Sequence, residues 1–248
     1  MKILSIINQK GGVGKSTTAH AIGAGLASKG YKVLMIDLDP QGNLTDTMRG
    51  QHSPQNALTV LLNPATSRGA IQTIEGLDLI PSSPALAGAD MQLSGTGKEY
   101  KLKEALEPLG TEYSYCIIDT PPALGILTVN ALTASTGTII PAQADLYSLQ
   151  GIAQLANTID TIKHYCNPAL SLEGILITRY NARSVIKRQI AEELERTAEQ
   201  LKTKLYQTKI RECTALVEAQ ATRQSIYDYS PRSNASRDYM AVVEEISL

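Results

Sequence analysis

The stretch NQKGGVGKSTT at residues 8–18 decides the fold of this chain. An apolar, β-branched run at residues 3–7 precedes it and predicts a buried strand, and a run rich in Ala, Gly and Leu at residues 19–28 predicts a buried helix. Strand, glycine loop and helix in this order form the context that a phosphate-binding loop requires. A mere tight connection is the alternative, and the length of this run in this context argues against it.

The residue types within the stretch match the chemistry of phosphate binding. Glycines let the backbone turn tightly and point its N–H groups at phosphate oxygens, and the helix start adds its positive dipole end. Lys15 supplies a cation for the β- and γ-phosphates, and the Ser16 hydroxyl can coordinate Mg²⁺. We therefore expect a nucleotide to contact Gly11, Gly12, Val13, Gly14, Lys15, Ser16 and Thr17.

The loop departs from the usual pattern G-x-x-x-x-G-K-[ST] at its start. Gln9 stands where the first glycine should be, and a second lysine, Lys10, follows it. This variant resembles the deviant Walker A loop of the ParA/MinD family of ATPases. The resemblance implies that ATP joins two copies in a sandwich homodimer, in which Lys10 reaches the nucleotide of the other copy and serves catalysis together with Lys15.

A second run places carboxylates at the end of a strand. Residues 32–37 predict a buried strand that ends in Asp37, and Asp39 follows within the run DLDPQGN. Carboxylates at the C-terminal ends of parallel strands lie where ligands bind, so this pair can face Mg²⁺ and a water. The run resembles the ParA branch, which implies that hydrolysis depends on Asp39. Asp37 is a second candidate for the metal because of its place at the strand end. A pair of helix-capping aspartates is the alternative.

A third run predicts the main metal ligand. The apolar strand at residues 115–118 ends in Asp119, and Thr120-Pro121-Pro122 forces an extended exit from it. This is a Walker B pattern, in which the aspartate binds Mg²⁺ directly or through a water. The Thr-Pro-Pro sequence resembles the family's switch II. An aspartate that caps a helix near Gly125 is the alternative, and the phosphate loop favours the metal.

Composition narrows the class of protein. With 248 residues, 43% hydrophobic residues and a net charge of −1, the chain predicts one globular domain at residues 1–248. Phe and Trp are absent, which disfavours base-stacking platforms for single strands. The three cysteines have no C-x-x-C spacing, and no apolar run approaches the ~18 residues of a membrane span. Because the chain opens on a strand, we expect neither a signal peptide nor a preceding helix-turn-helix module, and a cytoplasmic location.

The remaining pattern alternates strands with helices. We expect further strands at residues 77–81, 137–142 and 172–178, and helices at 82–93, 98–109, 148–166 (capped by Ser148), 183–204 and 234–248. Such alternation predicts an α/β fold of the P-loop NTPase type. Its doubly wound, mainly parallel sheet carries helices on both faces, and the nucleotide lies at the strand C-termini.

One loop is a candidate for contact with the nucleotide base. The last predicted strand leads into Thr178-Arg179-Tyr180-Asn181. This form also occurs in the ParA family, where the loop lies beside the adenine, and the resemblance implies a base contact near Asn181. The segment at residues 210–215 departs from the family's common Pro-Arg-Asn form, which leaves a base contact there open.

Charge is segregated toward the C-terminal third. Residues 179–211 contain nine basic and four acidic residues, a net charge of +5 in a chain whose net charge is −1. A solvated helix face explains such a run equally well. The resemblance implies that basic residues in this region form a non-specific DNA surface, and the first candidates are the clustered Arg183, Lys187 and Arg188.

The resulting hypothesis is an ATP- and Mg²⁺-dependent DNA-partitioning ATPase. Its ATP-bound homodimer binds double-stranded DNA, associates with the nucleoid and is released on hydrolysis, with a ParB-like or other centromere-binding protein as activator. A MinD-like membrane-associated ATPase is the alternative, but it needs a basic amphipathic C-terminal helix, and residues 240–248 contain no Lys or Arg. An electron carrier related to nitrogenase reductase needs paired cluster cysteines, which the spacing does not offer.

Overall fold

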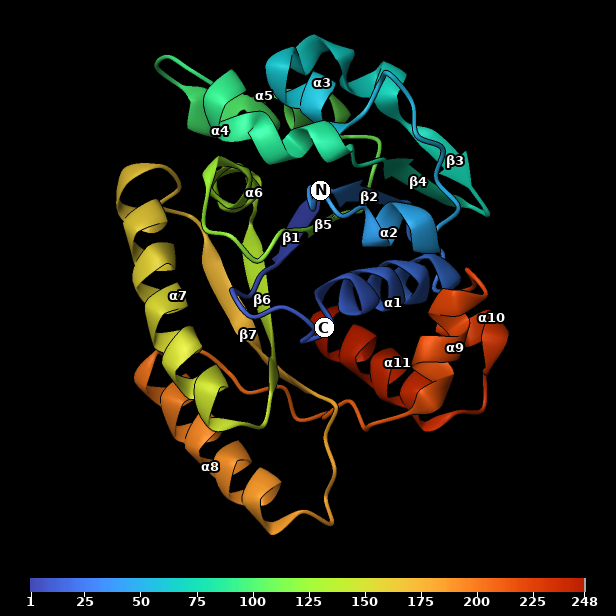
Figure 1. The fold of residues 1–248 in the computed structure, drawn as a ribbon, viewed down its shortest axis with the longest axis vertical. Helices are drawn as coiled ribbons and strands as arrows, with labels where there is room; N and C mark the ends of the chain where they lie inside the picture. The colour runs from blue at the N-terminus through green and yellow to red at the C-terminus, as the bar shows by residue number, and fades with distance from the viewer. Residues whose placement is uncertain (248) are drawn as a thin grey trace.

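A computed structural model describes residues 1–247, and a single mixed sheet runs through their centre (Figure 1). The order of its seven strands is β3-β4-β2-β5-β1-β6-β7, and every neighbouring pair is parallel except β3 and β4. The bounds are β1 Lys2–Ile6, β2 Val33–Asp37, β3 Gln72–Ile74, β4 Leu77–Ile80, β5 Tyr115–Asp119, β6 Gly137–Gln143 and β7 Ser171–Thr178. The expected doubly wound, mainly parallel α/β fold is confirmed.

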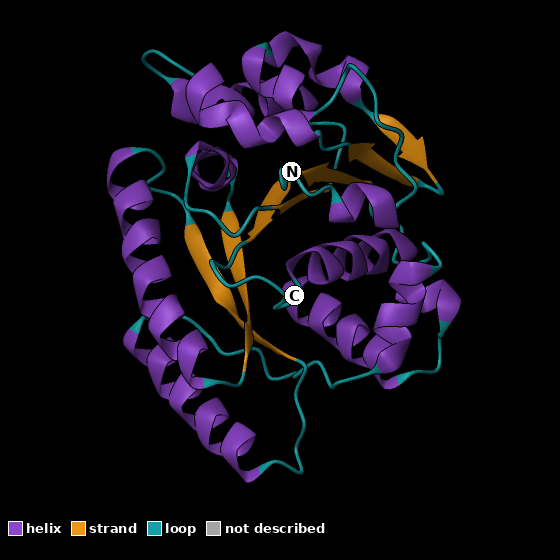
Figure 2. Ribbon diagram, viewed as in Figure 1, coloured by secondary structure: helices purple, strands orange, loops and turns teal. Residues whose placement is uncertain are grey.

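Helices cover both faces of this sheet (Figure 2). Successive residues of a strand point to opposite faces, so β2 sends Met35 toward one layer of helices and Leu34 and Ile36 toward the other. The first layer contains α1 (Lys15–Ser28), α9 (Thr214–Ala221), α10 (Ile226–Tyr229) and α11 (Asn234–Ser247). The second contains α3 (Ala57–Leu62), α4 (Ala89–Gln92), α5 (Lys101–Leu106), α6 (Ile126–Ala134), α7 (Leu146–Tyr165) and α8 (Val185–Gln200).

The register of the central strands brings distant acidic residues together. In β5, Asp119 lies opposite Ile6 of β1 and Asp37 of β2, so all three strands end at the same edge of the sheet. The phosphate loop leaves β1 at this edge, and the short helix α2 (Asn43–Thr47) follows β2 there. The edge therefore carries both strand-end aspartates and the glycine loop, as the sequence predicts.

The structure corrects several boundaries. The antiparallel edge strand β3 was not predicted from the sequence. Helices α9 and α10 in the C-terminal region were not predicted either. The expected helix at residues 82–93 consists of a 3₁₀ turn followed by α4. The expected helix at residues 98–109 contains 3₁₀ turns on both sides of α5, and Pro108 lies in the second of them.

Two long helices also differ from expectation. The prediction that Ser148 caps α7 is wrong, because Asp145 is the N-cap and its carboxylate accepts the N–H of Ser148 at 3.0 Å. Helix α8 is shorter than predicted and ends before Lys202, whose φ of 52° is left-handed. The C-terminal helix α11 matches the prediction up to Ser247, and Leu248 lies outside the described residues. No helix within the described part of the chain is long and apolar enough to cross a membrane.

Candidate functional site

The phosphate loop is a backbone cradle between β1 and α1. Gly12 and Gly14 have left-handed φ angles of 73° and 90°, a conformation that other residues adopt only with strain. Gly14 directly precedes α1, and within the described chain no side chain caps the start of this helix. The first N–H groups of α1 therefore remain available to an anion.

Side chains from neighbouring strands hold the loop in place. Thr178 at the end of β7 donates a hydrogen bond to the carbonyl of Val13 at 2.8 Å, and Gln143 at the end of β6 donates one to the carbonyl of Gly12 at 3.0 Å. Both carbonyl groups are thus occupied by the protein. The loop is fixed from the side before any ligand binds, which lowers the ordering cost of binding.

The two lysines of the loop lie in different environments. Lys15 is only 7% exposed and lines the cavity, and its amine lies 3.5 Å from the carbonyl oxygen of Lys10. Burial lowers the pKa of Lys15, and the charges of Asp119 and Asp39 oppose this effect without cancelling it. A buried cation beside the glycine loop is the group that phosphate binding requires.

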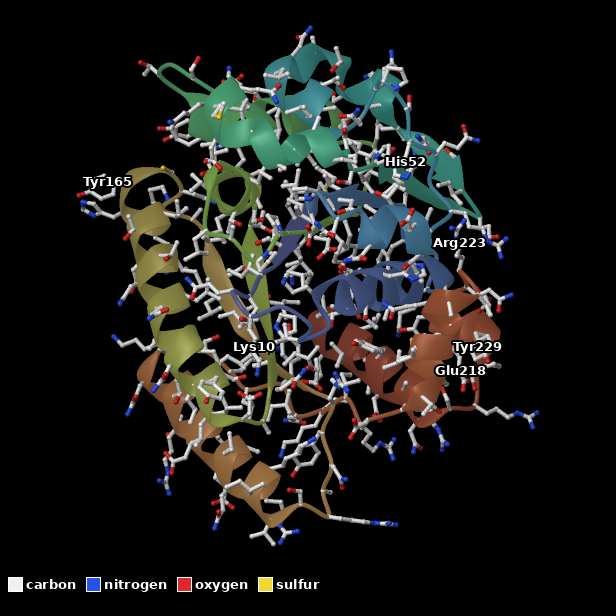
Figure 3. The ribbon with its side chains drawn as sticks, in the orientation of Figure 1. Lys10, His52, Tyr165, Glu218, Arg223 and Tyr229 are labelled. Carbon is white, nitrogen blue, oxygen red and sulfur yellow. The ribbon has the colours of Figure 1, made fainter. Side chains whose placement is uncertain are left out.

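Lys10 instead points away from its own phosphate loop. Its side chain is 36% exposed, and its amine forms an ion pair with Asp145 at the N-terminus of α7, at 2.5 Å. In Figure 3, Lys10 lies near the centre of the molecule on the side facing α7. Partial burial raises the pKa of Asp145, but hydrogen bonds from Lys10 and Ser148 outweigh this effect and the pKa is lowered.

The three predicted aspartates share one edge but have different hydrogen bonds. Both oxygens of Asp37 are occupied, by the N–H of Asp39 at 3.1 Å and by the N–H and hydroxyl of Thr45 in α2 at 2.8 and 2.7 Å. Asp37 therefore anchors α2 to the sheet. The carboxylate of Asp39 lines the cavity and accepts the N–H of Gln41 at 3.0 Å.

Asp119 has an environment that fits a metal ion. It is fully buried, and neither carboxylate oxygen has a hydrogen-bond partner within residues 1–247. Burial and the charge of Asp37 raise the pKa of Asp119 well above its usual value, and the nearby Ser16 hydroxyl and Lys15 only partly oppose this. A buried carboxylate without a partner is costly unless a cation completes it. The Ser16 hydroxyl and Asp119 are hard oxygen ligands of the kind that Mg²⁺ prefers.

A cavity of about 870 Å³ opens next to the loop and extends to the C-terminal region. The phosphate side comprises residues 11–17, Asp39 and part of α2. Asn181 is not among the lining residues. Its side-chain oxygen accepts the N–H of Arg183 at 3.0 Å, while Thr178 and Arg179 of the same loop do line the cavity. A base contact by Asn181 stays a prediction.

The opposite side of the cavity is formed by residues 210–213, which the sequence comparison with the family had pointed to, and by helix α9, which was not predicted from the sequence. Residues 210–214, Leu216, Val217, Gln220, Ala221 and Arg223 line it. The run TALVEAQA of α9 is rich in helix formers, so a helix there was predictable from composition. The place of α9 across the cavity from the phosphate loop could not be predicted from its sequence.

The candidate DNA-binding residues lie at the start of α8. Arg183 is exposed in the preceding loop, and Arg188 is exposed on the first turns of the helix. The amine of Lys187 donates to the carbonyl of Arg179 at 2.7 Å, and Arg188 donates to the carbonyl of Ala182 at 2.8 Å. The three side chains are thus grouped near one exposed end of a helix.

Comparison with known proteins identifies the family. A family model described as an AAA domain matches residues 1–172. The sporulation initiation inhibitor protein Soj of Bacillus subtilis is 40% identical over 99% of this chain and 98% of its own length. The chain belongs to the ParA/Soj family of partitioning ATPases. The chromosome partitioning protein ParA of Myxococcus xanthus is 36% identical, over 99% of this chain and 87% of its own.

Solved structures support the chemistry of this family. Cobyrinic acid a,c-diamide synthase of Mycobacterium smegmatis is 32% identical, with a TM-score of 0.86 over 98% of this chain and 93% of its own, and was solved with ADP and magnesium. The same protein was also solved with an ATP analogue and magnesium. As a family member, this chain is an ATP hydrolase with ATP and Mg²⁺ as its cofactors.

Proposed function

We propose that this chain is a DNA-partitioning ATPase whose ATP-bound homodimer binds double-stranded DNA non-specifically and is released on hydrolysis. Its relatives are named for chromosome partitioning, which supports DNA as the cargo. The observation that supports the dimer is that the two lysines of the loop lie in different environments. Lys15 is buried beside the glycine loop of its own chain, whereas Lys10 is partly exposed and forms an ion pair with Asp145.

Each residue of the site has a role in this proposal. Lys15 and the loop N–H groups neutralise phosphate charge, Ser16 and Asp119 hold Mg²⁺, and Asp39 positions the attacking water. Bound Mg²⁺ supplies charge neutralisation for the transferred phosphoryl group. Positioning and electrostatic stabilisation are sufficient for this chemistry, so a strong base is not required.

Lys10 would exchange one anion for another on dimerisation. In the single chain its amine contacts the carboxylate of Asp145. Phosphate oxygens of the nucleotide in a second copy carry more negative charge and can accept the same amine. We infer that ATP links the two copies in this way and thereby controls DNA binding.

The DNA surface is proposed at the start of α8. Arg183 and Arg188 are exposed there, and dimerisation would place two such clusters on one assembly, which explains why ATP controls binding. Contacts of this kind reach phosphates and carry no sequence information. A nucleoid association and a centromere-binding activator of the ParB type belong to the same proposal, as does a cytoplasmic location.

A membrane-associated function of the MinD type has no support in the C-terminal helix. The apolar residues Val242, Val243 and Ile246 of α11 are buried in the core cluster that also contains α1. Their face is thus used for packing. The sequence of this helix also lacks the basic residues that attract anionic lipids at its end.

Replacing Arg183, Lys187 and Arg188 together by Glu tests the DNA surface. We expect ATP-dependent binding to unrelated DNA fragments to be lost, while ATP-driven dimerisation on a sizing column persists. The wild type should lose affinity steeply as salt rises, because each neutralised phosphate releases counterions.

The matched control replaces Lys98, Lys103 and Lys163 by Glu, the same number of basic residues away from the start of α8. It should bind DNA as the wild type does. Retention of DNA binding by the first variant, folded and dimeric and with an unchanged salt slope, would move the surface elsewhere.

A further inference from the structure

The part of the cavity beyond the phosphate loop has to receive the nucleoside. The loop and Lys15 fix the phosphates at residues 11–16, and Thr17 follows them at the start of α1. From there the cavity continues to residues 178–179, residues 210–214 and α9. We call these three segments together with Arg223 the nucleoside wall.

One side chain connects the nucleoside wall to the phosphate side. The amide Nε2 of Gln220 in α9 donates a hydrogen bond to the Thr17 hydroxyl oxygen at 2.7 Å. Both residues line the cavity. The contact spans 203 residues of sequence, so the helix is held against α1 at the point where phosphates give way to sugar.

The direction of this hydrogen bond leaves two groups free for a ligand. Thr17 accepts from Gln220, so the proton of its own hydroxyl remains available for donation to a phosphate oxygen. The side-chain oxygen of Gln220 has no hydrogen-bond partner within residues 1–247 and is a strong acceptor. Gln220 thus donates a hydrogen bond to Thr17 through its nitrogen and offers its amide oxygen to a ligand next to Thr17.

We propose that Gln220 determines sugar specificity by accepting a hydrogen bond from a ribose hydroxyl of the nucleotide. The sugar follows the α-phosphate directly, and the amide is anchored 2.7 Å from Thr17. Leu216 and Val217, about one turn earlier in α9, are apolar and suit the flat face of a base instead. The inference rests on nucleotide binding alone and is independent of the proposed dimer and of DNA.

The physical reason for specificity is the cost of an unpaired acceptor. A site built to bond a hydroxyl rejects the analogue that lacks it, because its own polar group then stays desolvated without a partner. With a deoxynucleotide bound, the side-chain oxygen of Gln220 would lack the hydroxyl that donates to it. A typical cost corresponds to about tenfold in affinity.

The test compares the affinities of ADP, 2′-deoxy-ADP and 3′-deoxy-ADP by calorimetry. Diphosphates are chosen so that neither hydrolysis nor ATP-driven dimerisation contributes. The wild type is expected to bind ADP about tenfold more tightly than one of the two deoxy analogues. In Gln220→Met, a side chain of similar length without polar atoms, this preference should disappear.

The matched control is Gln224→Met. Gln224 is exposed just beyond α9 and is not among the residues that line the cavity, so this variant should keep the wild-type preference. A Gln220→Met variant that weakens all three ligands by the same factor would show a purely structural role for Gln220 and overturn the proposal. Equal affinities of the wild type for all three ligands would also overturn it, and that measurement needs no variant to fold.

Discussion

The two walls of the nucleotide cavity differ in how their residues come together. The phosphate wall is one contiguous stretch, residues 11–17, and depends on the left-handed backbone of Gly12 and Gly14. The nucleoside wall combines separate segments, joined where Tyr180 after β7 pairs with Arg211 before α9. The proposed phosphate contacts therefore lie in one local stretch, whereas the proposed nucleoside contacts depend on how the complete chain packs.

Lys15→Ala gives the largest expected effect and tests the phosphate wall. The buried amine is the cation of this wall, and α1 offers only neutral N–H donors in its place. We expect ADP affinity in calorimetry to fall by about a hundredfold or more. Lys103→Ala, which removes an exposed lysine of α5, is the control and should bind normally. An unchanged affinity of Lys15→Ala would contradict the assignment of the loop.

The sequence predicts the phosphate wall because its signals are adjacent and repeated. Gly12 and Gly14 mark backbone conformations, Lys15 marks a charge, and the apolar runs on both sides mark the strand and the helix. The same reasoning predicts that β2 and β5 end in Asp37 and Asp119 at one edge, and the parallel register confirms it. These features depend on residues near one another or on the general geometry of parallel sheets.

The sequence gives no comparable signal for contacts made by tertiary packing. Lys10 and Asp145 are 135 residues apart, and Gln220 and Thr17 are 203 apart. Neither Asp145 nor Gln220 belongs to a motif, so nothing marks them before the chain folds. Strand β3 has only three residues and lies at the edge of the sheet, too short for an alternating pattern to be visible.

Asp39→Ala separates binding from hydrolysis within the phosphate wall. Because Asp39 lines the cavity without contacting the loop amides, we expect ADP affinity and ATP-driven dimerisation to persist. ATP turnover should fall by about a hundredfold, since positioning of a reacting water contributes on this scale. The variant should also remain on DNA longer. Normal turnover would assign the positioning of water to another group, and Asp37 is the nearest carboxylate in the chain.

Lys10→Ala tests the contrast between the two lysines of the loop. The single chain should bind ADP nearly as well as the wild type, because Lys15 alone lies in its own phosphate site. The dimer with ATP should not form on a sizing column. Asp145→Asn is the opposite change: it removes the charge that holds Lys10, so dimerisation should require less ATP, by severalfold. A Lys10→Ala variant that dimerises normally would exclude a role for this lysine across the interface.

The last expected effect concerns how the packing of α1 against α10 responds to pH. His20 of α1 lies at a cavity of about 290 Å³ that is also lined by Glu75, Arg223 and Asp228. Asp228 belongs to α10, which follows the nucleoside wall. Burial lowers the pKa of His20 to about 4, although the charge of Asp228 opposes this. His20 is therefore neutral in the folded chain at pH 5 but largely protonated in the unfolded chain.

The sign of the effect follows from this difference in proton binding. Because the unfolded chain binds the proton more readily, the contribution of His20 to stability is present above about pH 6.5 and is lost as pH falls toward 4. Between pH 7 and pH 5 it amounts to about 2 kcal/mol at most.

His20→Gln should lose correspondingly less stability in urea unfolding over this interval, and His164→Gln, at an exposed position on α7, should behave as the wild type. The buried Asp37 and Asp119 have raised pKa values and act in the opposite direction, but they do so equally in all three proteins. Equal losses in the wild type and His20→Gln would mean that His20 is protonated alike in the folded and unfolded chain, and that the packing of α1 against α10 is insensitive to pH.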